Sequence, residues 1–231
     1  MKLPISERLL CCAGFVAPGA RVADIGTDHG YLGIYLLQEG IARTVYACDL
    51  REQPLARARE NAARFGVADR MQLLRADGLT ALSPDQIDTV VCAGMGGDLI
   101  ASILEAAPWL QSPAYRLILQ PQSAGQHLRR ILSEWNFEIL RETLVSEGGF
   151  LYTVLEARYG AGTELTPGQE YVSPQLLKDA SAHLPQYLDR IALSLGETVR
   201  GLRSSEKPEI RARLPYYETA LREVQEMRRT I

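Results

Sequence analysis

The chain has 231 residues, of which 46% are hydrophobic and 23% are charged, and its formal net charge is −3. This length supports one full-sized hydrophobic core with a modest addition, and the composition excludes a disordered or fibrous protein. The four cysteines lack the spacing of a metal site or a disulfide scaffold, and the three histidines are scattered. We therefore expect reduced thiols, a cytoplasmic location and no bound metal.

The first apolar run, residues 9–17, could belong to a signal peptide or to a short helix. Glu7 and Arg8 stand directly before it, and cleavage after Ala20 would leave the first core strand at the new N-terminus. Helical spacing is found at Ile5, Leu9, Cys12 and Val16. An amphipathic helix is therefore favoured. No run approaches the roughly 20 apolar residues of a membrane span, so we expect no membrane partner.

Between residues 21 and 158, short apolar runs alternate with helical patterns. We expect strands at 21–25, 44–49, 71–75, 87–92 and 116–120, and helices at 31–38, 54–65, 98–106 and 124–134. Such alternation predicts parallel strands joined by right-handed helical crossovers. Two further extended runs, 137–145 and 150–158, flank Ser-Glu-Gly-Gly and predict a hairpin. The predicted fold is a Rossmann-like α/β fold, with a mostly parallel, doubly wound sheet that ends in an antiparallel hairpin.

The remainder of the chain has a different pattern. Residues 160–168 are rich in Gly, Thr and Pro and read as a linker. A helix with one apolar seam is predicted by Leu184, Leu188, Ile191, Leu195, Val199 and Leu202. A turn at 204–208 precedes a second helix that runs to about residue 229, while Pro185 and Pro215 are each expected to start, kink or interrupt a helix. We therefore expect an α/β domain over 1–160 and a coiled-coil-like helical hairpin over 161–231.

The most informative segment reads Val22-Ala-Asp-Ile-Gly-Thr-Asp-His-Gly-Tyr31 and follows the first expected strand, where doubly wound folds bind ligands. A nicotinamide cofactor would require G-x-G-x-x-G here, so that backbone amides meet its pyrophosphate. Asp28 instead lies between Gly26 and Gly30, and Asp24 lies just upstream. Two carboxylates repel a pyrophosphate but suit an ammonium and a sulfonium group. The loop therefore favours S-adenosylmethionine.

Acidic residues also follow the second and third strands. Asp49, with Leu50 beside it, can accept hydrogen bonds from both ribose hydroxyls, and Asp77 before Gly78 can accept from the adenine amino group. Each acidic residue alone is more often a turn former or helix cap, but three in order favour a binding site. After the fourth strand, Ala93-Gly-Met-Gly-Gly97 is expected to be a tight strand-to-helix turn, a pocket wall beside the sulfonium, or both. The cofactor-binding candidates are Asp24, Gly26, Asp28, His29, Gly30, Asp49, Leu50, Asp77, Gly78, Ala93, Gly94 and Met95.

Together these segments resemble the bacterial tRNA (adenine(22)-N1)-methyltransferases. The matching pieces are Ile5-Ser-Glu-Arg-Leu9, Ala23-Asp-Ile-Gly-Thr-Asp-His-Gly-Tyr-Leu32, Asp49 with Pro54-Leu55, Asp77-Gly78-Leu79, Ala93-Gly-Met-Gly-Gly97 with Leu99-Ile100, and Leu117-Ile-Leu-Gln-Pro-Gln122. The resemblance covers the chain to about residue 158, and the tail also looks like that of the family. It departs at Gly33, where proline is usual, and at Gln122, where asparagine is common. The resemblance implies a class I methyltransferase that methylates N1 of adenine 22 in tRNA.

The expected chemistry assigns alternative roles to three residues. N1 of neutral adenine has an in-plane lone pair and no proton, so catalysis is mainly alignment, and a carboxylate would stabilise the cationic product. Asp28 is the first candidate for that carboxylate, and its alternative role is to cap the helix at Gly30. His29 could orient the base or bond locally. Gln120 could bond the adenine edge or end its strand before Pro121.

The distribution of charge along the chain indicates whether tRNA is the binding partner. A net charge of −3 argues mildly against tRNA, but residues 200–213 carry a local excess of three positive charges. The expected tRNA contacts are Arg8, Arg200, Arg203, Lys207, Arg211 and Arg213, although the last five could equally be a solvated surface. We expect a monomer. The alternatives are a methyltransferase for a small molecule or a protein, with the tail as a lid or dimerisation element, and a non-catalytic S-adenosylmethionine-binding protein.

Overall fold

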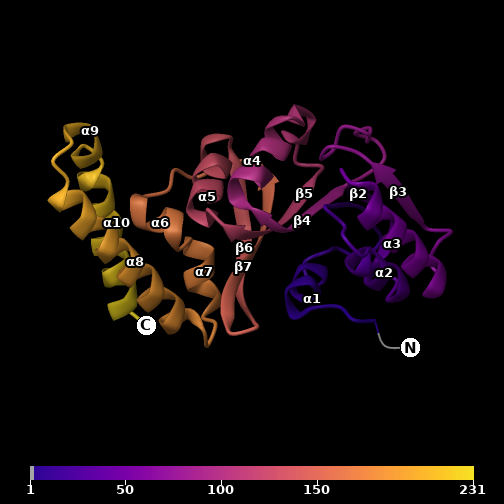
Figure 1. Cartoon of the computed structure of the whole chain (residues 1–231), viewed down its shortest axis with the longest axis horizontal. Coiled ribbons are helices and arrows are strands. Elements are labelled where there is room, and N and C mark those ends of the chain that lie inside the picture. The colour runs from indigo at the N-terminus through magenta and orange to yellow at the C-terminus, as the bar shows by residue number, and fades with distance from the viewer. Residues whose placement is uncertain (1–2) are drawn as a thin grey trace.

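A computed structural model describes residues 3–231 and contains one seven-stranded sheet with strand order β3-β2-β1-β4-β5-β7-β6 (Figure 1). The strands are β1 (Ala20–Ile25), β2 (Ala42–Asp49), β3 (Met71–Arg75), β4 (Thr89–Gly96), β5 (Arg116–Ser123), β6 (Phe137–Glu147) and β7 (Phe150–Tyr159). The first five strands pair in parallel, whereas β7 is antiparallel to both β5 and β6. The predicted doubly wound sheet that ends in a hairpin is therefore confirmed.

Helices cover both faces of the sheet. One apolar cluster contains side chains from α1 (Glu7–Ala13), α2 (Tyr31–Gln38) and α3 (Glu52–Arg64). The other contains side chains from α4 (Gly97–Glu105), the 3-10 turn η1 (Pro108–Leu110) and α5 (Gly125–Glu134). Alternate strand residues point to opposite faces, so Val91 joins the first cluster while Val90 and Cys92 join the second. The carboxyl ends of the parallel strands are thereby held on a rigid, two-sided core.

The C-terminal residues form a group of helices at the β6–β7 end of the sheet (Figure 1). They are α6 (Pro167–Tyr171), α7 (Pro174–Asp179), α8 (Leu184–Ser204), α9 (Pro208–Arg211) and α10 (Leu214–Arg229). Two ion pairs fix α8 antiparallel to α10, because Asp189 near the start of α8 pairs with Arg228, and Arg203 near its end pairs with Glu218. The helical hairpin expected for the tail is present.

The helices of the tail share an apolar core with the sheet. Leu144 of β6 and Leu151 of β7 belong to the same buried cluster as Leu176, Leu188 and Val224. The expected division of the chain into 1–160 and 161–231 stays a prediction. The shared core means that the hairpin is packed from both sides, by the sheet and by the tail.

Several details of the tail differ from the sequence prediction. The expected linker over 160–168 ends inside α6, and α6 and α7 were not predicted because five and six residues are too few to show helical periodicity. The second tail helix is split into α9 and α10. Pro215 lies in the first turn of α10 and Pro185 in the first turn of α8. Of the three expected effects, starting, kinking or interrupting a helix, both prolines therefore show the first.

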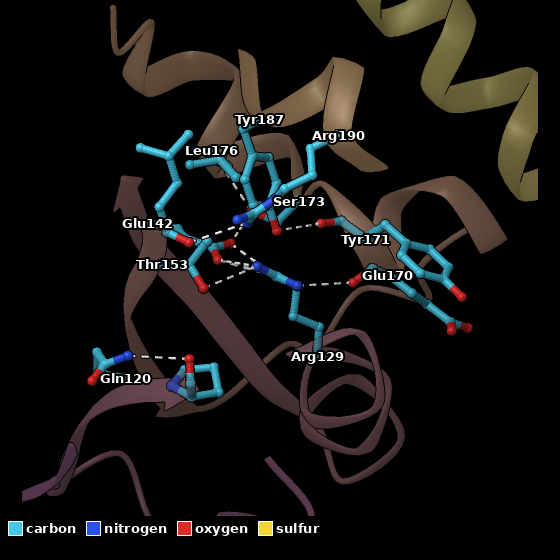
Figure 2. Close-up of polar contacts among 12 residues, drawn as sticks. Gln120, Arg129, Glu142, Thr153, Glu170, Tyr171, Ser173, Leu176, Tyr187 and Arg190 are labelled. Carbon is cyan, nitrogen blue, oxygen red and sulfur yellow. Dashed lines mark hydrogen bonds and ion pairs between the residues drawn. The ribbon is translucent and has the colours of Figure 1, made fainter. Parts of the chain in front are cut away.

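A buried ion pair connects α5, the sheet and the tail helices (Figure 2). Arg129 of α5 pairs with Glu142 of β6, and the guanidinium also donates to the carbonyl oxygen of Glu170 in α6, at 3.1 Å. Glu142 accepts from the hydroxyl of Ser173 at 2.5 Å, and Ser173 in turn caps α7. Burial alone would lower the pKa of Arg129, but the Glu142 carboxylate raises that pKa above its ordinary value. The two side chains therefore join the sheet to the tail.

Candidate functional site

The site begins with the loop that joins β1 to α2. Gly26 and Gly30 both have left-handed backbones, with φ of +75° and +73°. The amides of Gly26 and Thr27 both donate to the carbonyl oxygen of Cys48, at 2.8 and 3.1 Å, which folds the loop over the end of β2. A Cβ atom on Gly26 would collide with the methyl group of Met95. Glycine at position 26 therefore allows the loop and the end of β4 to approach closely.

Asp24 is a buried carboxyl group near the end of β1, just before this loop. It is 5% exposed, and its one hydrogen-bond donor is the hydroxyl of Thr27, at 2.7 Å. Burial raises the pKa of Asp24 to about 6, the negative charge of Asp49 adds to the rise, and the Thr27 hydrogen bond opposes it. No basic side chain within residues 3–231 forms an ion pair with Asp24. A cationic ligand would therefore stabilise its ionised form.

A cavity of about 250 Å³ opens beside this carboxylate. The cavity lies at the carboxyl ends of β1 and β4. Seven of the residues that we expect to bind cofactor or tRNA line it. The lining residues are Arg8, Leu9, Asp24, Gly26, Thr27, Asp28, His29, Tyr31, Leu32, Ala93, Gly94 and Gln122. The cavity thus combines two carboxylates with a loop of open backbone, in the place where doubly wound folds bind ligands.

Asp28 and His29 lie at the mouth of the cavity. The side chain of Asp28 is 63% exposed, and its Oδ2 atom lies 3.5 Å from Nε2 of His29. The His29 ring stacks on Tyr31, with centroids 5.3 Å apart and planes at 9°. The N-cap of α2 is Gly30, which has no side-chain cap hydrogen bond. The alternative that Asp28 caps this helix is therefore wrong, because its carboxylate is directed to His29.

The other acidic candidates lie at neighbouring strand ends, outside the cavity lining. Asp49 is 8% exposed and accepts from the amide of Arg51 at 2.9 Å, while Leu50 beside it is 61% exposed. The carbonyl oxygen of Asp49 accepts from the amide of Ala76, which draws the segment before Asp77 toward the end of β2. Gly78 has φ of +55°. An acidic residue thus lies at or just after the carboxyl end of each of β1, β2 and β3.

The segment Ala93-Gly-Met-Gly-Gly97 carries the chain directly from β4 into α4. β4 continues to Gly96, and α4 begins at the next residue. The strand register is irregular on both sides of Met95, and Gly94 has φ of +79°. The irregularity exposes Gly94 at the cavity wall, where its amide donates to Oε1 of Gln120 at 3.0 Å.

Gln120 lies beneath the cavity and not in its lining. Its side chain is fully buried, and Oε1 accepts from Nη1 of Arg8 at 2.8 Å as well as from the Gly94 amide. Its Nε2 donates to the carbonyl oxygen of Pro121. The alternative that Gln120 ends the strand is wrong, because β5 continues to Ser123. Protein partners already occupy both polar atoms of Gln120.

Arg8 connects the cavity to the tip of the β6–β7 hairpin. Its guanidinium pairs with Glu147 and lies 4.9 Å from the ring centroid of Tyr152. Burial alone would raise the pKa of Glu147, but hydrogen bonds from Arg8 and Ser6 hold it below its usual value. Glu147 and Tyr152 carry no local sequence signal of a site. Their part in it depends on a contact between residues 139 positions apart.

The basic cluster of the tail lies far from this cavity, around α9 (Figure 1). All five side chains are exposed. Arg203 pairs with Glu218, and Arg213 donates to the hydroxyl of Tyr217 at 2.7 Å. The cluster is defined by Arg200, Arg203, Lys207, Arg211 and Arg213. The structure therefore separates the tail cluster from Arg8, the sixth expected tRNA contact.

Residues 3–231 contain neither a metal-binding cluster nor a membrane-spanning helix. No group of three His, Cys, Asp or Glu side chains in this part of the chain could hold a metal ion. No helix in the same part is long and apolar enough to cross a membrane. All four cysteines are free thiols.

Comparison with known proteins defines the class first. Residues 5–155 match the family model described as a methyltransferase domain. The match spans the sheet through most of β7 and includes every residue that lines the cavity. The fold and the site are therefore those of a methyltransferase, with a Rossmann-like sheet.

Individual relatives then narrow the family. A tRNA (adenine(22)-N(1))-methyltransferase of Bacillus subtilis is 33% identical over 187 residues, which cover 78% of this chain and 78% of that protein. The crystal structure of the B. subtilis M1A22 tRNA methyltransferase superposes with a TM-score of 0.89 at 26% identity, over 98% of this chain and 100% of that one. The chain belongs to the tRNA (adenine(22)-N1)-methyltransferase family, and the resemblance found in the sequence is confirmed.

A further solved structure bears on the ligand. A Streptococcus pneumoniae protein, provisionally assigned as a tRNA (m1A22) methyltransferase, was solved in complex with S-adenosyl-L-methionine. It superposes with a TM-score of 0.79 at 31% identity, over 94% of this chain and 99% of that one.

Proposed function

We propose that this protein transfers a methyl group from S-adenosylmethionine to N1 of adenine 22 in tRNA. The observation that carries the proposal is the buried Asp24 carboxylate, which has no basic partner within residues 3–231 and faces a cavity shared with Asp28. Such a site repels a pyrophosphate and attracts a cationic ligand. Membership of the family supports tRNA as the substrate and N1 of adenine as the reacting atom.

The residues present fit S-adenosylmethionine. Asp24 would hold the ammonium group, since a bound cation would offset the cost of its burial. Asp49 would accept from the ribose hydroxyls, and Asp77 from the adenine amino group. The exposed side chain of Leu50 would cover one face of the adenine ring. Gly26 leaves open the space beside Met95 into which a side chain would otherwise project.

The reaction requires alignment more than proton transfer. When bound, S-adenosylmethionine supplies a methyl group whose carbon–sulfur bond breaks as the N1 lone pair forms the new carbon–nitrogen bond. The methylated base becomes cationic, so a carboxylate near N1 lowers the energy of the transition state. The exposure of Asp28 at the cavity mouth supports this role for its carboxylate. His29, held by its stack on Tyr31, would orient the base.

Gln120 and Arg8 act as positioning residues in this proposal. Gln120 accepts from both Arg8 and the Gly94 amide, so it fixes the backbone of the cavity wall relative to α1. Because its side chain is fully buried, we do not assign it a direct contact with adenine. The sequence predicted that Gln120 could bind the adenine edge. We propose instead that Gln120 acts indirectly, by holding the backbone of Gly94.

The experiment is nucleoside mass spectrometry of unmodified tRNA incubated with the protein and S-adenosylmethionine. We expect 1-methyladenosine to form, and to be lost when adenine 22 of the transcript is replaced by guanine. Methylation that persists in the replaced transcript would overturn the assigned position. Binding of S-adenosylmethionine without any methylated tRNA would overturn the function, and would favour a small-molecule or protein substrate or a binding protein.

A further inference from the structure

A second and larger cavity lies between the β6–β7 hairpin and the tail. Its volume is about 580 Å³, compared with about 250 Å³ for the cavity beside Asp24. The walls come from the end of β5 and the start of α5, from β7, and from α6 and α8. We call it the hairpin–tail cleft. None of the roles assigned above to cofactor or target adenine uses it.

The cleft is cationic in a protein whose net charge is negative. Its lining includes Arg129 and Arg190 and contains no aspartate or glutamate. The charge of Arg129 is balanced by Glu142. Arg190 donates to the carbonyl oxygen of Leu151 at 3.1 Å and has no ion pair with a carboxylate within residues 3–231 (Figure 2). One uncompensated positive charge therefore remains at the cleft and suits an anionic ligand.

Aromatic rings supply the second feature of the cleft. Phe150 and Tyr152 both line it and lie two residues apart on β7, with ring centroids separated by 6.4 Å. Phe150 is 62% exposed, so one ring face is open to a ligand. Tyr187 supports Arg190, whose guanidinium carbon lies 5.3 Å from its ring centroid. An open aromatic face and an arginine in one cleft form a combination that binds single-stranded nucleotides.

The cleft adjoins the cofactor cavity. Gln122 lines both cavities. Arg8 lines the smaller cavity and lies over the ring of Tyr152, which lines the cleft. If one unit of a polymer binds near Asp28, the next unit therefore has the cleft beside it.

We propose that the hairpin–tail cleft binds a nucleotide of the tRNA strand next to the adenosine that is methylated. Its base stacks on Phe150 and Tyr152, and its phosphate contacts Arg190. The inference rests on the proposed tRNA methyltransferase function and adds a second subsite to it. The cleft would hold the neighbouring nucleotide out of the helical stack while N1 of the target faces the methyl group.

The test uses the full chain with Arg190→Gln and Phe150→Ala as variants. The matched controls are Arg43→Gln and Leu193→Ala. Arg43 is exposed and lies near the start of β2, whereas Asp49 lies at the opposite end of the same strand. Leu193 is 63% exposed and lies outside the cleft lining. Unfolding midpoints in urea confirm that all four variants fold, and calorimetry measures their affinity for S-adenosylmethionine.

We expect each cleft variant to weaken tRNA affinity by about tenfold and to leave cofactor affinity within twofold. Arg190→Gln should also lower the salt slope of tRNA binding by about 1, whereas Arg190→Lys should retain it. Ultraviolet cross-linking of the wild type should attach peptides that contain Phe150 or Tyr152 to nucleotides beside the target. Cleft variants no weaker than their controls, or adducts only to remote nucleotides, would overturn the inference.

These outcomes separate the inference from the function on which it rests. If the wild type forms 1-methyladenosine but both cleft variants match their controls, only the cleft proposal fails. If the wild type forms no 1-methyladenosine in tRNA, the proposed function fails and the cleft proposal fails with it.

Discussion

Arg129 and Glu142 form an ion pair whose side chains are 1% and 0% exposed. The pair lies where α5, β6, α6 and α7 meet, and each of its members also bonds to the tail. A buried charge without its partner is costly, so the two residues depend strongly on one another. The joint between sheet and tail is consequently sensitive to a change that removes a single charge.

Glu142→Gln should destabilise the protein by about 3–5 kcal/mol, because the Arg129 guanidinium would remain buried without a counter-charge. The free energy of unfolding from urea denaturation measures the effect. Asp189→Asn, which breaks the exposed pair with Arg228, is the control and should cost no more than about 1 kcal/mol. Equal effects in the two variants would show that the buried pair contributes no more than a surface pair. Arg129→Met in the Glu142→Gln background should restore part of the loss.

The affinity for S-adenosylmethionine should depend on the ionisation of Asp24. The ligand-free carboxyl has a pKa of about 6, and only its ionised form attracts an ammonium group. Affinity should therefore fall, approaching tenfold per pH unit, as the pH drops below about 6. Calorimetry between about pH 5 and pH 7.5 measures this dependence. Asp24→Asn should bind more weakly at neutral pH and lose the dependence, and a wild-type affinity that does not change with pH contradicts the assignment.

Asp24 should also affect the stability of the ligand-free protein, which should gain from a low pH where cofactor affinity loses. Because the folded pKa of Asp24 is raised above the unfolded value, the folded state retains its proton between about pH 4 and pH 6. Its contribution to the unfolding free energy of the ligand-free protein therefore grows as the pH falls through 6, and is lost as the pH rises. Unfolding in urea at several pH values should show a smaller gain in Asp24→Asn than in the wild type. Parallel curves for the two proteins would exclude this linkage.

Asp49→Ala should weaken the binding of S-adenosylmethionine by about 1.5–3 kcal/mol, which is typical of hydrogen bonds to a charged group. The side chain is buried, but its hydrogen-bond donor within the protein is the nearby amide of Arg51, so the fold should survive. Calorimetry gives the affinity and circular dichroism checks folding. An unchanged affinity in the folded variant removes Asp49 from the ribose site. NADH serves as a negative control ligand, because Asp24 and Asp28 should prevent its pyrophosphate from binding.

Asp28→Asn should lower the single-turnover rate by about 10²–10³ if the carboxylate stabilises the cationic product. Cofactor affinity should change little, since asparagine has the same shape and tolerates the φ of +37° found at this position. A fall in affinity along with rate would instead assign Asp28 to the methionine ammonium. Measuring cofactor dissociation and single-turnover methylation on the same variant distinguishes the roles. Full turnover would end the catalytic assignment.

Replacing the five basic residues of the tail cluster by glutamine should weaken tRNA binding and flatten its salt dependence. Four of them, Arg200, Lys207, Arg211 and Arg213, have no ion pair within the described part of the chain, so their charges are available to phosphates. Titrations at several salt concentrations provide the slope. Affinity for S-adenosylmethionine is the internal control and should not change. An identical slope would identify the cluster as an ordinary solvated surface.

Much of the fold could be predicted because its signals are local. The helix expected at 31–38 and the strand expected at 71–75 have those bounds in the structure, since glycines or polar residues delimit short apolar runs. The loop from Asp24 to Gly30 was identified as the ligand site for the same reason. Its two acidic residues and two glycines lie within seven positions, and the structure places this loop at a cavity.

The features that could not be predicted depend on distant contacts. Nothing near Gln120 in the sequence indicates that Arg8 and Gly94 occupy its oxygen. The composition of the loop favours a cap at Asp28, but the N-cap of α2 is Gly30, and Asp28 has a left-handed backbone and makes no cap hydrogen bond. The cleft beside Arg190 also has no sequence signature, because its walls come from four separate segments of the chain.

The β6–β7 hairpin constrains how this enzyme could have acquired its tail. One edge of β7 pairs with β5 and joins the hairpin to the rest of the sheet, and Leu144 and Leu151 complete the core of the tail helices. Residues 161–231 alone would lack these apolar partners, and the hairpin alone would expose them. A tail exchanged between relatives would therefore need its own hairpin to match. The segment that would have to be exchanged as one piece therefore begins near β6, inside the methyltransferase sheet, and not at the glycine-rich segment after the hairpin.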